Sequence, residues 1–106
     1  MARTLITAPA SARRGEAITL RVLLQHPMES GYRPGVDDRV LPRDIVRRFA
    51  CSYNGERVVE VELFPAVAAN PYLEFSALAV DSGTLFFEWQ GDNGFQHREQ
   101  RSISVA

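Results

Sequence analysis

Apolar and polar residues alternate along most of this chain, in short runs that end at turn-forming residues. In residues 16–26, for example, Ile18, Leu20 and Val22 fall on one face, with Thr19 between them on the other. The same alternation is found in residues 45–53, 57–64, 72–80 and 84–90. A period of two is what a half-buried strand of an antiparallel sheet requires, so the pattern predicts a fold built of strands.

Turn-forming residues separate these runs. Asn54-Gly55 supplies the two positive φ values of a type I′ turn and predicts a β-hairpin between the runs on either side of it. The sequence Asp81-Ser82-Gly83 predicts a second tight hairpin, and residues 91–94 predict a third turn.

An opening run over residues 3–8 and a closing run over residues 95–105 complete the set. The total is about seven strands, the number found in an immunoglobulin-like antiparallel β-sandwich. A length of 106 residues fits a single domain, and we expect residues 1–106 to form one all-β sandwich.

Two segments break the alternation. Residues 26–44 contain three prolines and two glycines, too many for a ladder of hydrogen bonds, and they predict a long loop of the kind that carries function. Residues 64–72 are bracketed by Pro65 and Pro71 and are compatible with a short helical turn. Residues 41–49 also fit a helical period, but β-branched Ile45 and Val46 favour a strand there.

The charge and hydropathy of the chain exclude several classes of function. The net charge is −1, without the basic excess of a protein that binds nucleic acid or an acidic membrane, and all 12 basic residues are arginine. No run approaches the roughly 20 apolar residues of a membrane span. Nothing at the start resembles a secretory signal, which by itself predicts a cytoplasmic protein.

Catalytic chemistry finds little support in the sequence. Cys51 alternates inward with Phe49 and Tyr53, where a thiol is inert filler rather than a nucleophile. Glu60 and Glu62 alternate outward and predict a solvated face, not an acid/base pair. We therefore expect no enzymatic activity and no cofactor.

A metal site is one alternative. His26, Met28, Cys51 and His97 are by type the ligands of a blue-copper centre. In such centres the cysteine, the methionine and a histidine crowd into one short loop, whereas Cys51 lies in the middle of a strand. The pattern favours loop or core roles for both histidines and predicts no metal.

Recognition of other proteins is the remaining function. Met28, Tyr32 and Arg33 of the long loop are residue types enriched at interfaces, and Phe86 alternates outward between inward neighbours. An alternative role for Tyr32 and for Phe95, which follows the last turn, is to cap the ends of the core. The candidate partner-binding residues are His26, Met28, Tyr32, Arg33, Phe86 and Phe95.

Four blocks of the sequence resemble a known family in order and spacing. They are LITAPASARRGEAITLRVLLQHPMESGYRPG, LPRDIVRRFACSYNGE, ELFPAVAANPYLEF and GDNGFQH. The HPMESG and FPAVAANPYL segments are the most specific of them. In these blocks the chain resembles the SoxZ family, the Z subunits of the SoxYZ carrier of bacterial thiosulfate oxidation, over nearly its whole length.

The resemblance implies an immunoglobulin-like, non-catalytic subunit that forms a heterodimer with SoxY. In that family SoxY bears the cysteine, on a mobile Gly-rich arm, and this chain ends in ISVA without such an arm. The resemblance also implies transient contacts with a c-type cytochrome, a sulfate-releasing hydrolase and a sulfane dehydrogenase. It further implies a periplasmic location reached by export together with SoxY.

An interface tight enough for such export is of the obligate class, on the order of 2,000 Å² or more. Outward residues such as Phe86 and Leu78 are candidates to supply part of it. Two alternatives remain at this point: a homodimer in the absence of SoxY, and a stand-alone sandwich that binds metal or sulfur.

Overall fold

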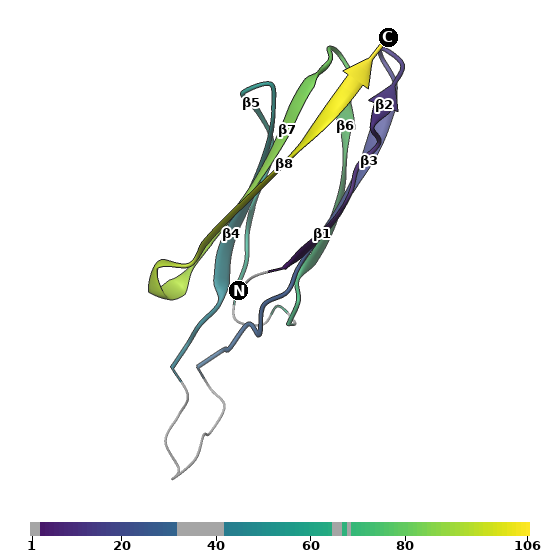
Figure 1. Cartoon of the computed structure of the whole chain (residues 1–106). Coiled ribbons are helices and arrows are strands. Elements are labelled where there is room, and N and C mark those ends of the chain that lie inside the picture. The colour runs from purple at the N-terminus through teal and green to yellow at the C-terminus, as the bar shows by residue number, and fades with distance from the viewer. Residues whose placement is uncertain (1–2, 32–41, 65–66, 68) are drawn as a thin grey trace.

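A computed structural model describes residues 3–31, 42–64, 67 and 69–106 of the chain (Figure 1). Within these residues the fold is eight strands and one short 3₁₀ turn. They are β1 (Thr4–Thr7), β2 (Ser11–Ala12), β3 (Ala17–Leu24), β4 (Val46–Tyr53), β5 (Glu56–Glu62), β6 (Tyr72–Leu78), β7 (Gly83–Gly91), η2 (Asp92–Gly94) and β8 (Gln96–Val105). No helix in the described part is long and apolar enough to cross a membrane.

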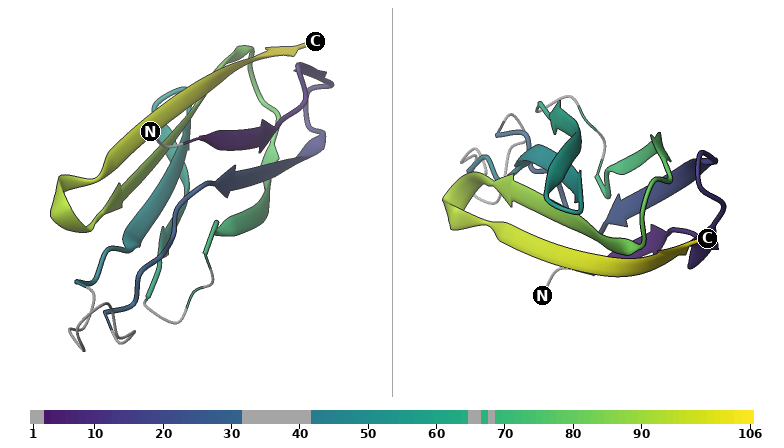
Figure 2. Two further views of the ribbon diagram at one scale, coloured as in Figure 1. Left: turned by 60° about the horizontal axis from the view of Figure 1, so that its bottom comes forward. Right: turned by 90° about the horizontal axis from the view of Figure 1, so that it is seen from above.

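The strands form two sheets that face each other (Figure 2). One sheet has the order β1-β3-β6 and the other the order β2-β8-β7-β4-β5. All neighbours are antiparallel except β2 and β8, which pair in parallel over two residues. The predicted immunoglobulin-like sandwich is confirmed, with the short β2 as an addition to the expected strands.

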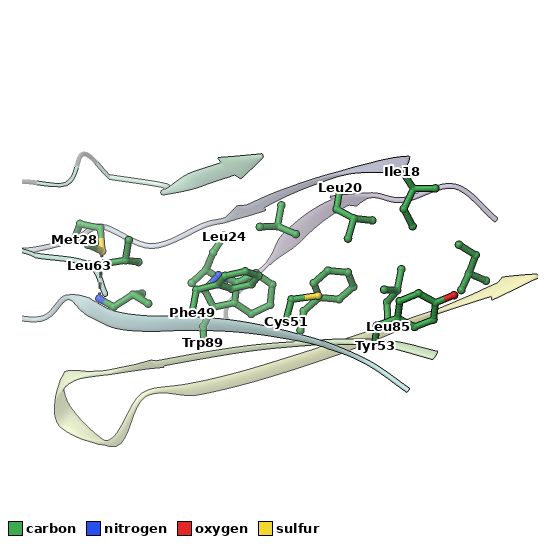
Figure 3. Packing of buried hydrophobic residues seen from close by; sticks show 14 of the residues in the cluster. Ile18, Leu20, Leu24, Met28, Phe49, Cys51, Tyr53, Leu63, Leu85 and Trp89 are labelled. Atoms are coloured by element: carbon green, nitrogen blue, oxygen red, sulfur yellow. Dashed lines mark hydrogen bonds between the residues drawn. The ribbon is translucent and has the colours of Figure 1, made fainter. Parts of the chain in front are cut away.

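The core lies between the two sheets, where the inward residues of each strand meet (Figure 3). Phe49 of β4 and Trp89 of β7 are fully buried, with ring centroids 5.0 Å apart, and Leu24 faces them from the other sheet. Leu85 and Phe87 are buried and Phe86 is exposed, so the predicted alternation of β7 is confirmed. Burial of these aromatic rings supplies much of the stabilisation of a sandwich this small.

The β4–β5 hairpin confirms the predicted type I′ turn. Asn54 and Gly55 have φ values of 49° and 86°, the left-handed conformations that this turn requires. Asn54 also reaches a second strand, because its Oδ1 atom accepts a hydrogen bond from the Thr84 N–H at 3.0 Å. The turn therefore ties the start of β7 to the end of β4.

The hairpin predicted at residues 81–83 is wrong. β6 and β7 belong to different sheets, so this segment crosses from one sheet to the other. The hydroxyl of Tyr53 fixes the crossing, since it donates to the Asp81 carbonyl and accepts from the N–H groups of Val80 (3.3 Å) and Asp81 (3.2 Å). The same turn-forming residues can join two strands of one sheet or of different sheets. The sequence pattern therefore does not distinguish a hairpin from a crossing between sheets.

The described ends of segment 26–44 contain no strand apart from an isolated bridge between Glu29 and Asp44, whose N–H and C=O groups exchange hydrogen bonds of 2.8 Å. This agrees with the loop predicted there, although its middle, residues 32–41, lies outside the described residues. β4 begins at Val46, as the β-branched residues predicted.

Candidate partner-binding site

The structure brings three of the predicted partner-binding residues together. His26, Met28 and Phe95 meet at the end of the sandwich that carries segment 26–44, while Phe86 lies on the outer face of the five-stranded sheet. Tyr32 and Arg33 lie outside the described residues, so their role stays a prediction.

His26 joins three segments of this end. Its backbone N–H donates to Oδ1 of Asn70 at 2.9 Å, and the Asn70 N–H donates back to the His26 carbonyl at 2.8 Å. The imidazole meets the ring of Phe95 edge-on, with centroids 4.9 Å apart. The backbone of His26 thus fastens the start of the loop to the β5–β6 connection, and its side chain, 5% exposed, packs against the β7–β8 turn.

The hydrogen bonds of His26 define its protonation state. Nδ1 accepts from the Met28 N–H at 3.0 Å, which requires a neutral ring with its hydrogen on Nε2. Nε2 lies 3.9 Å from Oδ1 of Asp44. Burial lowers the pKa of His26, and this effect outweighs the opposing influence of the Asp44 and Asp92 carboxylates. The neutral imidazole is therefore a structural acceptor.

Met28 shapes the backbone that follows His26. Its φ is 51°, a left-handed conformation that is uncommon outside glycine and costs about 1–2 kcal/mol. Its Sδ atom accepts a hydrogen bond from the Val46 N–H at 3.2 Å. Like His26, Met28 is only 5% exposed. This burial favours a supporting role for both residues over direct contact, and partner binding through them stays a prediction.

Asp92, at the β7–β8 turn, holds the other side of the loop base. Its carboxylate accepts two hydrogen bonds from Arg43, at 2.8 and 3.0 Å, and lies 3.3 Å from Nε of Arg47. The carboxylate also accepts from the Ile45 N–H at 3.2 Å, and the backbone N–H of Asp92 donates to the Ile45 carbonyl at 2.9 Å. The bond from Arg43 is the main reason that the pKa of Asp92 is lowered, with smaller contributions from Ile45 and Arg47. Bidentate pairs of this kind fix geometry as well as adding energy.

Sequence reasoning missed Asp92, Arg43 and Asn70. The sequence pattern indicates only a turn at Asp92, although an aspartate beside Asn-Gly can equally bind a distant arginine. Asn70 precedes a proline and has φ 55°, so it also occupies a turn position. Arg43 and Asp92 are 49 residues apart in the sequence. The strand topology brings them together, and the sequence alone does not give that topology.

A hollow of about 360 Å³ lies beside the loop base. Phe64, 60% exposed, stands at its edge. Arginine and aromatic side chains are the residue types that concentrate in protein interfaces. The lining residues are Arg43, Ile45, Arg47, Arg48, Glu62, Leu63, Phe64 and Gln90.

Phe86 stands on a mostly polar face. It is 36% exposed and lies in register with Ser52 of β4 and Gln100 of β8. The same face carries ion pairs between neighbouring strands, 2.7 Å for Arg48–Glu60 and 3.7 Å for Arg98–Glu88. A single apolar residue among charges is common on protein surfaces, so its role in partner binding stays a prediction.

Cys51 is fully buried in the core, on the inward face predicted for it. Burial raises the pKa of its thiol to about 12, with Arg57 opposing the shift, so the group is protonated at neutral pH. The described residues contain no group of three or more His, Cys, Asp or Glu that could hold a metal. His26 lies at the loop base, whereas His97 lies on β8 beside Trp89.

Fold and site together define a class: an immunoglobulin-like β-sandwich with an arginine-lined hollow beside the base of segment 26–44. Residues 6–102 match the family model described as sulphur oxidation protein SoxZ. The chain belongs to the SoxZ family. Comparison with curated protein sequences gives no match.

Solved structures share the fold at low sequence identity. Superoxide reductase (neelaredoxin) from Ignicoccus hospitalis has a TM-score of 0.76 at 18% identity, covering 97% of this chain and 80% of that one. The sulfur carrier protein SoxY from Chlorobium limicola f thiosulfatophilum has a TM-score of 0.68 at 16% identity, covering 97% of this chain and 78% of that one. A putative superoxide reductase from Thermotoga maritima has a TM-score of 0.73 at 15% identity, covering 97% of this chain and 85% of that one. These similarities establish the fold alone.

Proposed function

We propose that this chain is the non-catalytic scaffold subunit of a SoxYZ-type sulfur carrier. Membership of the SoxZ family and the SoxY-like fold support a role as a subunit of a sulfur-oxidation carrier complex. The finer proposal is that the chain binds SoxY as a heterodimer and helps to present the cysteine-bearing arm of SoxY to the enzymes of thiosulfate oxidation, in the periplasm.

The burial of Cys51 supports a non-catalytic role for this chain. A carrier that attaches sulfur covalently needs an accessible thiolate, because the thiolate is the nucleophile. Cys51 is fully buried, and its raised pKa keeps it protonated at neutral pH. This state supports a complex in which the partner supplies the sulfur-bearing cysteine.

The loop base supports the docking role. His26, Met28 and Asp92 hold the two described ends of segment 26–44 in a defined position, next to a hollow with three arginines at its rim. A rigid support that carries a loop is the usual way in which a β-sandwich presents a recognition surface. Transient contacts with the c-type cytochrome, the hydrolase and the dehydrogenase are proposed at this end.

Binding to SoxY is the direct test. The chain is expressed alone and together with a SoxY protein, and the masses of the products are measured by size exclusion with light scattering. We expect a 1:1 complex that survives dilution to about 1 μM, as an obligate interface would. A chain that elutes alone and shows no affinity for SoxY by calorimetry would contradict the proposal.

Location is tested by fractionation. The chain is produced in cells with a SoxY that bears an export signal, or with the same SoxY lacking that signal. We expect the chain in the periplasm only in the first case. Recovery in the periplasm in both cases would contradict export with SoxY.

A further inference from the structure

Strand β6 lies at an open edge of the three-stranded sheet. β3 pairs with it on one side, from Tyr72 to Leu78, and no described residue pairs with it on the other. An unpaired edge presents a row of backbone N–H and C=O groups that another strand can bind. The question is whether this edge is blocked, as edges usually are, or available.

The backbone of β6 shows which groups are available. Ala79, directly after the strand, donates to the Glu16 carbonyl at 2.8 Å and accepts from the Gly15 N–H at 2.7 Å, so its groups point towards the β3 side. The direction alternates along an antiparallel strand. The N–H and C=O groups of Tyr72, Glu74, Ser76 and Leu78 therefore point outward from the sheet.

Side chains do little to block this edge. Proteins usually protect an edge strand with charges, proline or a bulge. The one charged residue of β6, Glu74, is already paired with Arg21 of the same sheet at 3.6 Å. Tyr72 is 51% exposed and Leu78 56%, and Val80 just beyond is 44% exposed.

The edges of the five-stranded sheet differ. β5 carries four charged residues in seven, and β8 carries Arg98, Glu99 and Arg101 where β2 does not cover it. Both have the charges that discourage pairing with another strand. β6 is thus the least protected long edge strand among the described residues.

The core is also incompletely covered along β6. Its inward residues, Leu73, Phe75 and Ala77, are only partly buried, as are Val59 and Val61 on the facing edge strand β5. A hollow of about 500 Å³ opens between the start of β5 and the end of β6. A further strand beside β6 would cover these apolar groups and satisfy the outward backbone groups at the same time.

We propose that the β6 edge is the docking site for an extended segment of the SoxY partner, which adds to the three-stranded sheet as a fourth strand. This rests on the proposed function, which supplies the partner. The segment would run beside about seven residues, roughly 23 Å, with apolar side chains turned towards the seam and a basic or hydroxyl residue beside Glu74. Backbone hydrogen bonds would supply affinity, and the alternate side chains would supply specificity.

Ser76→Pro tests the proposal, with Ser76→Ala as its matched control. The Ser76 N–H points outward, so proline removes a docking donor and leaves the ladder with β3 intact, as proline on an edge strand does. We expect Ser76→Ala to bind SoxY like the wild type and Ser76→Pro to bind at least about tenfold more weakly in calorimetry. Equal affinities for the two variants would overturn the inference, whereas a wild type without affinity would overturn the proposed function.

Two further measurements complement the Ser76 variants. Amide hydrogen exchange of the wild-type chain should slow at Tyr72, Glu74, Ser76 and Leu78 when SoxY binds, and unchanged exchange there would overturn the proposal. Phe86→Ser probes the opposite sheet and should weaken binding less than Ser76→Pro does. A larger loss with Phe86→Ser would place the interface on the five-stranded sheet, and a wild-type homodimer that Ser76→Pro abolishes would make a second copy the occupant.

Discussion

The sulfur atom of Met28 accepts a hydrogen bond from the backbone N–H of Val46, 18 residues along the chain. Val46 is the first residue of β4, and Met28 lies near the start of the long segment that precedes it. A buried thioether thus closes the base of the segment, together with the Glu29–Asp44 bridge. The position of the loop base is therefore set by contacts of buried core residues.

Met28→Leu tests that closure. Leucine keeps the apolar volume but cannot accept the hydrogen bond, and we expect the free energy of unfolding to fall by about 1 kcal/mol. Amide exchange at Val46 should become faster. Leu85→Met, a conservative change elsewhere in the core, should leave Val46 exchange unchanged. Unaltered exchange at Val46 in Met28→Leu would show that the sulfur contact is unimportant.

His26 should make stability depend on pH. Its pKa is lower in the folded chain than in the unfolded one because burial disfavours the charged ring. The unfolded state therefore binds more protons than the folded state as the pH falls through about 6.5. The free energy of unfolding should decline as the pH is lowered from about 7 to about 5. In His26→Asn the amide oxygen can still accept from Met28 and no longer titrates, so urea unfolding across that range should show a smaller decline. His97→Asn retains His26 and should retain its decline; an identical slope in His26→Asn and the wild type would contradict the assignment.

Cys51 should be inert in the native chain. With its pKa raised to about 12 and its side chain buried, it should resist iodoacetamide at pH 8 and react once the chain is unfolded in urea. Cys51→Ser buries a hydroxyl and should cost about 1–3 kcal/mol of stability, yet sulfur carriage by the complex should persist. Loss of thiosulfate-dependent turnover in a folded Cys51→Ser complex would refute the non-catalytic role.

Phe95 separates recognition from packing. Its ring is partly buried against His26, and leucine can preserve much of that apolar contact. We expect Phe95→Leu to lower the free energy of unfolding by less than about 1.5 kcal/mol. SoxY or enzyme binding should weaken by about tenfold. Parallel losses of stability and affinity would assign Phe95 to capping the core. We expect Tyr32→Ala, too, to weaken partner binding more than stability.

Much of the fold could be predicted because the period of two fixes which side chains face inward. The alternation around Phe86 and the two left-handed residues at Asn54-Gly55 are local signals, and both are confirmed. The crossing at residues 81–83 could not be predicted, because the same turn residues serve a hairpin and a change of sheet.

The site was harder to predict than the fold. Residue types drew attention to His26 and Met28 as contact residues, whereas the structure buries both. Their positions depend on Asn70 and Val46, which are distant in the sequence and carry no signal for such contacts. The parallel β2–β8 pairing also spans only two residues, too few for any periodicity to reveal.

Trp89, the single tryptophan of the chain, lies fully buried against Phe49. Its fluorescence is therefore an internal optical reporter of the sandwich core, at a site remote from solvent. Emission that stays at short wavelength shows that a variant keeps its core, whatever happens at its surface. A variant that loses SoxY but keeps this emission has lost a contact, and one whose emission shifts to long wavelength has lost the fold.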